Sequence, residues 1–120
     1  MPIINSTEFG SITIDNIKYS QVLILENRVI ERDYNKLKEL FGTSHKIGDW
    51  EFNELIGGKP EVILIGTGEQ GMLVVEDKVI HAIRDMGVEF IIEKTPIAIN
   101  IYNERVRSGK KINALIHTTC

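Results

Sequence analysis

The pattern of apolar and polar positions changes character at Pro60, halfway along the 120-residue chain. Before Pro60, short apolar clusters alternate with turn residues. After it, continuous apolar runs alternate with segments in which apolar residues recur at helical spacing. We therefore predict one α/β domain over residues 1–120, with three layers and a mixed sheet. Its N-terminal half is expected to be an antiparallel β-meander, and its C-terminal half a parallel βαβαβ unit.

Four apolar clusters follow one another between Phe9 and Arg32. Asp15-Asn16 and Glu26-Asn27 lie between clusters and have the chemistry of tight turns. These features predict one meander with strands over residues 12–14, 17–19, 22–25 and 29–32. Residues 33–48 follow neither a helical nor a strand period, so we expect mostly loop there. Asp49 is expected to cap a short helix that ends at Gly57.

The second half contains three strand-like runs separated by two helix-like segments. Val62-Ile63-Leu64-Ile65 is a continuous apolar run, as expected for a strand covered on both faces. A helix is predicted from Val75 to Met86, then a strand over residues 88–93. Thr95 is the expected N-cap of a second helix, and a last strand covers residues 112–116. The expected buried stripe of that second helix comprises Ile97, Ala98, Ile101, Tyr102 and Val106. If the three strands share a sheet, the helical crossovers make them parallel.

Ligands of such units bind outside the carboxyl ends of the parallel strands, where loops and helix N-termini converge. Three segments are therefore expected to share one rim: Gly66–Gly71, Glu93–Thr95 and His117–Cys120. The first segment, Gly66-Thr67-Gly68-Glu69-Gln70-Gly71, has the glycine spacing of a dinucleotide-binding loop. It is either a glycine-rich turn or a site for an anion or nucleotide. The binding residues in the second case are Gly66, Thr67, Gly68, Gly71 and Thr95.

Two features weaken the dinucleotide interpretation. The fingerprint requires an acidic residue about 20 positions further on, at the end of the next strand. Glu89 falls inside the predicted strand and Glu93 comes late. The chain also contains only one such half, so a complete dinucleotide-binding fold is not expected.

The candidate proton-transfer residues are His117, Glu93 and His45. Cys120 lies three positions after His117, and odd spacing in an extended strand sends two side chains to opposite faces. We therefore expect no metal site and no catalytic Cys-His pair. We also expect no cofactor.

Charge and composition narrow the classes of partner. The chain has 14 basic and 17 acidic residues, a net charge of -3, and no basic stripe. Nucleic acid and membranes are thus not expected partners. Cys120 is the only cysteine, and the N-terminus has neither a secretory signal nor a mitochondrial presequence. These features predict a cytoplasmic protein.

Several motifs in this order resemble those of one known family: Gly42-Thr43-Ser44-His45, Ile65-Gly66-Thr67-Gly68, Tyr102-Asn103 after Thr95, and the ending His117-Thr118-Thr119-Cys120. They resemble the Mth-type domain of unknown function. That family includes the adipogenesis-associated Mth domain-containing protein and, more distantly, the mitochondrial complex I assembly factor three. The resemblance implies a three-layer fold with about five strands in its mixed sheet. It implies no established catalytic activity, and it implies action through protein contacts.

Two functions from different classes follow. The first is a non-catalytic regulatory or assembly module that binds a protein partner, with or without a small anion at the rim. The outer face of the meander is the expected partner surface. The alternative is a small enzyme that acts on an anionic or nucleotide-like substrate at Gly66–Gly71. Monomer and homodimer both stay open, because an exposed strand edge can pair with its copy.

Overall fold

The computed structural model describes all 120 residues and contains eight strands and four helices. The strands are β1 (Ile4–Glu8), β2 (Ser11–Ile14), β3 (Ile17–Tyr19), β4 (Val22–Leu25), β5 (Arg28–Glu31), β6 (Val62–Thr67), β7 (Glu89–Glu93) and β8 (Ile112–His117). The helices are α1 (Tyr34–Phe41), α2 (Asp49–Ile56), α3 (Asp77–Asp85) and α4 (Thr95–Arg107).

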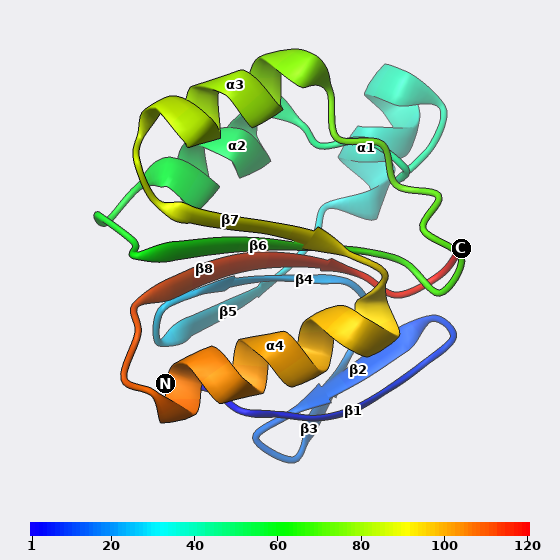
Figure 1. Ribbon diagram of the computed structural model, residues 1–120. Coiled ribbons are helices and arrows are strands. Elements are labelled where there is room, and N and C mark those ends of the chain that lie inside the picture. The colour runs from blue at the N-terminus through cyan, green and yellow to red at the C-terminus, as the bar shows by residue number, and fades with distance from the viewer.

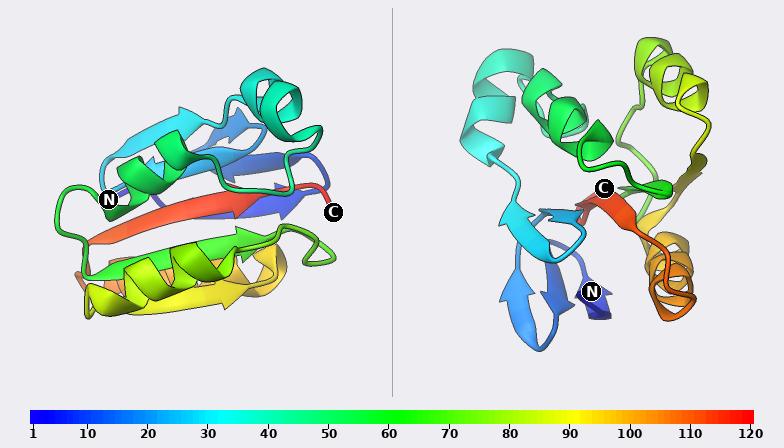
Figure 2. Two further views of the ribbon diagram at one scale, coloured as in Figure 1. Left: turned by 90° about the horizontal axis from the view of Figure 1, so that it is seen from above. Right: turned by 90° about the vertical axis from the view of Figure 1, so that its left-hand side faces the viewer.

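A five-stranded mixed sheet with the order β5-β4-β8-β6-β7 forms the middle layer. Helices α1, α2 and α3 lie on one side of it (Figure 1). Helix α4 and a separate sheet with the order β1-β2-β3 lie on the other side (Figure 2). The predicted three-layer α/β fold with a mixed sheet is therefore confirmed.

The parallel βαβαβ unit is confirmed as well, because β6 pairs in parallel with both β7 and β8. All six residues of β6 are buried, as its continuous apolar run predicted. Val62 and Leu64 pack in the cluster around α4, whereas Ile63 and Ile65 pack in the cluster under α2 and α3. Alternate side chains thus fill two separate cores, one on each face of the sheet.

The predicted antiparallel meander is present, but it is divided between two sheets. The first strands form their own sheet, which includes the unpredicted strand β1, while β4 and β5 join the main sheet. Strand β4 pairs antiparallel with β8, from Val22 opposite Ile116 to Leu25 opposite Asn113, and β5 pairs with β4. All four residues of β4 are buried, so this strand needs cover on both faces, which a two-sided position in the main sheet provides.

The prediction of mostly loop over residues 33–48 is also wrong, because α1 begins at Tyr34. The Asp33 carboxylate accepts a hydrogen bond from the Lys36 N–H at 3.0 Å and so caps the helix. Gly42 ends it in the left-handed conformation with φ of 72°. Only Leu37 of this helix is buried. Tyr34, Leu37, Leu40 and Phe41 recur at helical spacing, so the sequence contained a helical signal here that the prediction missed.

Helix α4 departs from its prediction in two details. Lys94, not Thr95, occupies the N-cap position, and the Thr95 side chain does not cap this helix. The predicted buried stripe is correct for Ala98 and Tyr102, but Ile97 is 50% exposed.

The three-stranded sheet is attached to α4 by residues far apart in the chain. The Asn103 side-chain amide accepts a hydrogen bond from the Ile4 N–H at 2.9 Å and donates one to the Ile4 carbonyl at 2.7 Å. The Tyr102 hydroxyl donates to the Pro2 carbonyl at 2.8 Å. Ile12 and Ile14 of β2 complete the contact by entering the core cluster around α4.

None of the four helices is both long enough and apolar enough to span a bilayer.

Candidate functional site

The carboxyl ends of the three parallel strands meet at one edge of the main sheet, which we call the C-terminal edge. Gly66 of β6 lies opposite both Glu93 of β7 and Ile116 of β8, and Thr67 lies opposite His117. The predicted common rim is therefore present. The antiparallel strands contribute to the same edge, because β4 begins there after Gln21 and β5 ends there before Arg32.

His117 is completely buried at this edge. Its Nδ1 lies 2.7 Å from Oε1 of Gln21, which can only accept a hydrogen bond, so Nδ1 carries the proton. Its Nε2 then accepts a hydrogen bond from the Thr119 hydroxyl at 3.1 Å. Burial, followed by the nearby positive charge of Arg32 and by His45, lowers the pKa of His117 to about 4. The imidazole is therefore neutral at pH 7, with both nitrogens already paired.

Arg32 forms the centre of a buried polar cluster, which we define as Gln21, Arg32, Ser44, Glu51 and His117. Its Nε and Nη2 atoms donate to the two carboxylate oxygens of Glu51 at 2.7 and 3.0 Å. The side chains of Arg32 and Glu51 are 1% and 0% exposed. The remaining donors of Arg32 bond to Oε1 of Gln21 and to the carbonyls of Ser44 and Lys46. All five N–H groups of the guanidinium are thus used.

This cluster explains the position of the segment from Gly42 to His45. Two carbonyls of the adjoining loop accept hydrogen bonds from Arg32, and the Gly48 N–H donates to Glu51 at 3.0 Å. The loop is thereby held against the sheet. It brings His45 to His117, with ring centroids 5.0 Å apart and ring planes at 89°. Two of the three predicted proton-transfer residues therefore lie together.

The glycine loop is occupied by the last residues of the chain itself. The N–H groups of Glu69, Gln70 and Met72 donate to the main-chain oxygens of Thr119 and Cys120 at 2.8 to 3.1 Å. A Cβ atom at Gly68 would lie 2.5 Å from the carbonyl carbon of Cys120 and 2.7 Å from the ring of His117. Gly68 also has φ of 104°, which residues with a side chain rarely adopt. Only glycine fits at position 68, because a side chain there would collide with Cys120 and His117.

Thr95 connects the ends of these segments. Its hydroxyl donates to the His117 carbonyl at 2.5 Å and accepts from the Gly68 N–H at 2.9 Å. Thr95 is completely buried, and Gly66 leaves the space that its hydroxyl fills, since a Cβ there would lie 3.0 Å from Oγ1. Three of the predicted binding residues, Thr95, Gly66 and Gly68, thus already make internal contacts at the positions where a ligand was expected.

A pocket of about 440 Å³ lies beside the glycine loop. Its polar lining includes Thr67, Gly71, Glu93 and Lys94, and its apolar lining is Leu73, Val75, Ile80 and Ile92. Glu93, the third predicted proton-transfer residue, therefore faces this pocket and not the histidine pair. The predicted site residues divide into a buried histidine group and a solvent-facing pocket.

The cluster's central residues, Gln21, Arg32 and Glu51, were not predicted from the sequence. The available signals were weak: Gln21 and Arg32 flank the apolar strands β4 and β5, and Glu51 lies in an amphipathic helix. A charged residue at such a position is normally exposed, and only the pairing of two distant ones shows that both are buried. No group of three or more His, Cys, Asp or Glu side chains is arranged to hold a metal ion.

The comparisons with known proteins agree with this fold. Conserved hypothetical protein PH1505 from Pyrococcus horikoshii OT3 is 30% identical over 98% of each chain, with a TM-score of 0.82. The protein MT938 is 28% identical over 100% of each chain, with a TM-score of 0.77. A Mth938-like domain from Bordetella pertussis, solved by NMR in solution, is 15% identical over 97% of this chain and 85% of its own, with a TM-score of 0.63, and shows the fold alone.

None of the curated proteins matches the sequence. The family model that matches residues 4–117 is described as "Protein of unknown function (DUF498/DUF598)". The Mth-type relatives confirm the resemblance predicted from the sequence motifs. The chain therefore belongs to this DUF498/DUF598 family of Mth-type domains.

Proposed function

We propose that this chain is a non-catalytic module that binds a protein partner at its C-terminal edge. The observation that carries the proposal is a group of exposed apolar side chains around this edge. We call this group the edge patch and define it as Phe9, Tyr34, Met72 and Val74. These side chains are 63%, 51%, 52% and 57% exposed, respectively. The proposal retains the cytoplasmic location expected from the sequence.

Main-chain hydrogen bonds and a shared cavity place the edge patch around the last residues of the chain. Phe9 precedes Gly10, whose N–H donates to the Thr118 carbonyl at 2.9 Å. Met72 donates its own N–H to Cys120, and Val74 donates to the His45 carbonyl. Tyr34 and Thr119 line one small cavity. Three segments distant in sequence thus meet at one end of the molecule, the right-hand end in Figure 1, and each carries an exposed apolar side chain. Such clustering is typical of a protein-binding surface.

The polar groups of the same edge support a non-catalytic role. A general base must reach a substrate proton with a free lone pair. The Nε2 lone pair of His117 already accepts from Thr119, and the imidazole is completely buried. The loop N–H groups that would bind an anion donate to Thr119 and Cys120. Catalysis here would require several internal hydrogen bonds to break first.

The outer face of the three-stranded sheet, expected from the sequence to bind the partner, is polar. Ser6, Thr13 and Lys18 lie opposite one another on that face, while Ile12 and Ile14 face the core. A polar face of this kind fits solvent contact. The edge patch replaces it in our proposal.

The test is isolation of stable complexes from the native host, with the chain produced at its normal level. We expect a stoichiometric partner protein with the wild-type chain and its loss in the double variant Phe9→Ser, Met72→Ser. The matched control is Met86→Ser, Ile97→Ser, which changes two exposed apolar residues, 39% and 50% exposed, outside the edge patch. Binding is then measured between purified components. Absence of a stoichiometric partner, or equal loss in both double variants, would overturn the proposal.

A second candidate is a small enzyme for an anionic or nucleotide-like substrate, and the pocket beside the glycine loop favours it. That pocket combines an apolar wall with Lys94 and Glu93. The test is thermal unfolding with phosphate, nucleotides and carboxylates, in the wild type, Lys94→Gln and Lys18→Gln. A ligand at about 100 times its dissociation constant adds about 2.7 kcal/mol to the free energy of unfolding. A stabilisation lost only with Lys94→Gln supports this candidate, and no stabilisation by any ligand contradicts it.

A further inference from the structure

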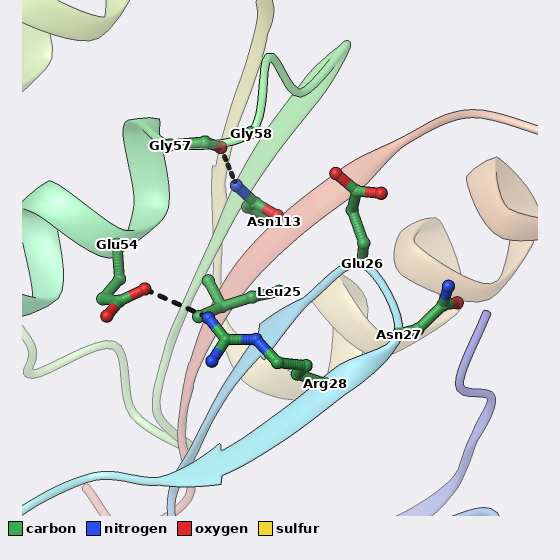
Figure 3. A pocket seen from close by; sticks show the side chains of 8 residues that line it. All are labelled: Leu25, Glu26, Asn27, Arg28, Glu54, Gly57, Gly58 and Asn113. Carbon is green, nitrogen blue, oxygen red and sulfur yellow. Dashed lines mark hydrogen bonds and ion pairs between the residues drawn. The ribbon is translucent and has the colours of Figure 1, made fainter.

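We propose that a second pocket, at the opposite end of the main sheet, binds a small polar molecule through a protonated amine. This pocket, shown in Figure 3, has a volume of about 360 Å³. It lies between the turn that joins β4 to β5 and the turn that follows α2, with Asn113 of β8 at its base. It shares no residue with the C-terminal edge and is independent of the partner proposed above.

The Asn113 side chain supplies the observation that points to a ligand. Asn113 is 2% exposed, and its Nδ2 donates to the carbonyls of Leu55 and Gly57 at 2.8 and 2.9 Å. These two bonds fix which end of the amide is nitrogen. Its Oδ1 is the one buried side-chain N or O atom of the molecule without a hydrogen-bond partner. In Figure 3 the nitrogen points to Gly57 and the oxygen points away from it. A buried acceptor of this kind calls for a donor.

The polar groups around the pocket select the type of donor. Glu26 and Glu54 both line it, and they face a single lining cation, Arg28. Arg28 already pairs with Glu54 at 3.3 Å, and Lys111 from outside the lining pairs with Glu26 at 3.5 Å. Both pairs are partly exposed, so each is weak. Within the lining two carboxylates outnumber one guanidinium, and Lys111 balances the remaining negative charge from outside. The preference for a protonated amine over an anion therefore rests on the oxygen acceptors of the lining.

Two turns with positive φ angles bring the Glu26 carboxylate and Gly58 together at the pocket. Glu26 has φ of 56°, in the left-handed region that residues other than glycine seldom occupy. Gly58 has φ of 75°, and a Cβ there would lie 3.2 Å from Oε1 of Glu26. The Glu26 carboxylate therefore rests against a position without a side chain. The φ of Glu26 follows from its place in the two-residue hairpin turn between β4 and β5.

The lining contains one hydrophobic residue, Leu25, among eight. A ligand held mainly by apolar contacts is therefore not expected. The pocket suits a small, hydrophilic amine whose N–H groups donate to Oδ1 of Asn113 and to the two carboxylates. Putrescine is a suitable probe, because it has two ammonium groups on a short chain.

The experiment is an NMR titration of the ¹⁵N-labelled chain with putrescine at constant ionic strength. We expect saturable shifts of the Asn113 side-chain amide and of the Gly57 and Gly58 N–H groups. Butanediol, a neutral diol of the same chain length, is the control for charge. Sodium chloride at equal ionic strength is the control for screening. Saturation by putrescine alone supports the proposal, while no saturation, or equal effects of butanediol, overturns it.

Variants connect the shifts to the pocket. Glu54→Gln removes an exposed ion-paired carboxylate of the lining, and we expect it to raise the dissociation constant about fivefold. Glu89→Gln is the matched control, because Glu89 is also ion-paired and is 45% exposed, against 47% for Glu54, but does not line the pocket. Both positions are on the surface, so the fold is expected to persist. An equal effect of the two variants would overturn the proposal.

Discussion

At the scale of single residues, the pair of Arg32 and Glu51 is the clearest determinant of local structure. Its hydrogen bonds hold the loop before α2 and orient Gln21 towards His117. A buried ion pair contributes little compared with apolar residues of the same size, but loss of one partner leaves an isolated buried charge. The two residues should therefore behave as a unit.

We predict that Arg32→Met lowers the free energy of unfolding by about 3 to 5 kcal/mol, because Glu51 remains buried without its partner. The double variant Arg32→Met, Glu51→Leu should recover much of this loss. Urea unfolding at pH 7 measures both. The control is Arg28→Met, which removes an exposed ion pair and should cost at most about 1 kcal/mol. A double variant as unstable as Arg32→Met would contradict this account.

A second prediction at this scale concerns pH. The pKa of His117 is lowered to about 4 in the folded chain, so the unfolded chain binds more protons between that value and the ordinary value of 6.5. The free energy of unfolding therefore does not depend on His117 protonation above about pH 6.5. It decreases as the pH falls from there towards 4, because the unfolded chain takes up the proton first. The difference amounts to about 3 kcal/mol at most. Unfolding free energies of the wild type and His117→Gln at pH 7 and 4.5 test this. Equal pH dependence of the two proteins would show that His117 is not the group responsible.

At the scale of elements, the ends of three strands and one helix depend on the Thr95 hydroxyl. We predict that Thr95→Val lowers the free energy of unfolding by about 1 to 3 kcal/mol, since the Gly68 N–H loses its acceptor in a buried place. Thr7→Val is the control, because Thr7 lies partly exposed in β1 and should change stability by less than about 0.5 kcal/mol. Thermal and urea unfolding measure both variants. Equal effects would mean that the hydroxyl is not what joins these ends.

The elements also show what the sequence can and cannot predict. Strands β6 and β8 and helix α4 were predicted because their apolar residues are consecutive or recur at helical spacing. The prediction missed α1, although Tyr34, Leu37 and Leu40 recur at helical spacing there. The periods themselves cannot tell which sheet β4 joins. The rim of the candidate site follows from the order of strands and helices alone. Its buried polar cluster does not, because the contacts between Arg32, Glu51 and His117 are made only on folding.

At the scale of the whole molecule, the Asn103 side chain makes two of the hydrogen bonds that attach the three-stranded sheet to α4. We predict that Asn103→Ala costs about 2 to 3 kcal/mol, because the Ile4 N–H and carbonyl both lose their partner. Hydrogen exchange should accelerate in β1, β2 and β3 and stay slow in β6 and β8. Asn100→Ala, an exposed change on the same helix, is the control. Uniform acceleration in both sheets would show that the two do not open separately.

The attachment of β1 to α4 also has a consequence for how the chain acquires its fold. The hydrogen bonds between Ile4 and Asn103 join residues 99 positions apart. The first sheet can dock on α4 only after Asn103 has left the ribosome, and closing so long a loop delays the contact further. Until then, Ile12 and Ile14 have no core to enter. We therefore expect the nascent chain to need protection of its first strands for most of its synthesis.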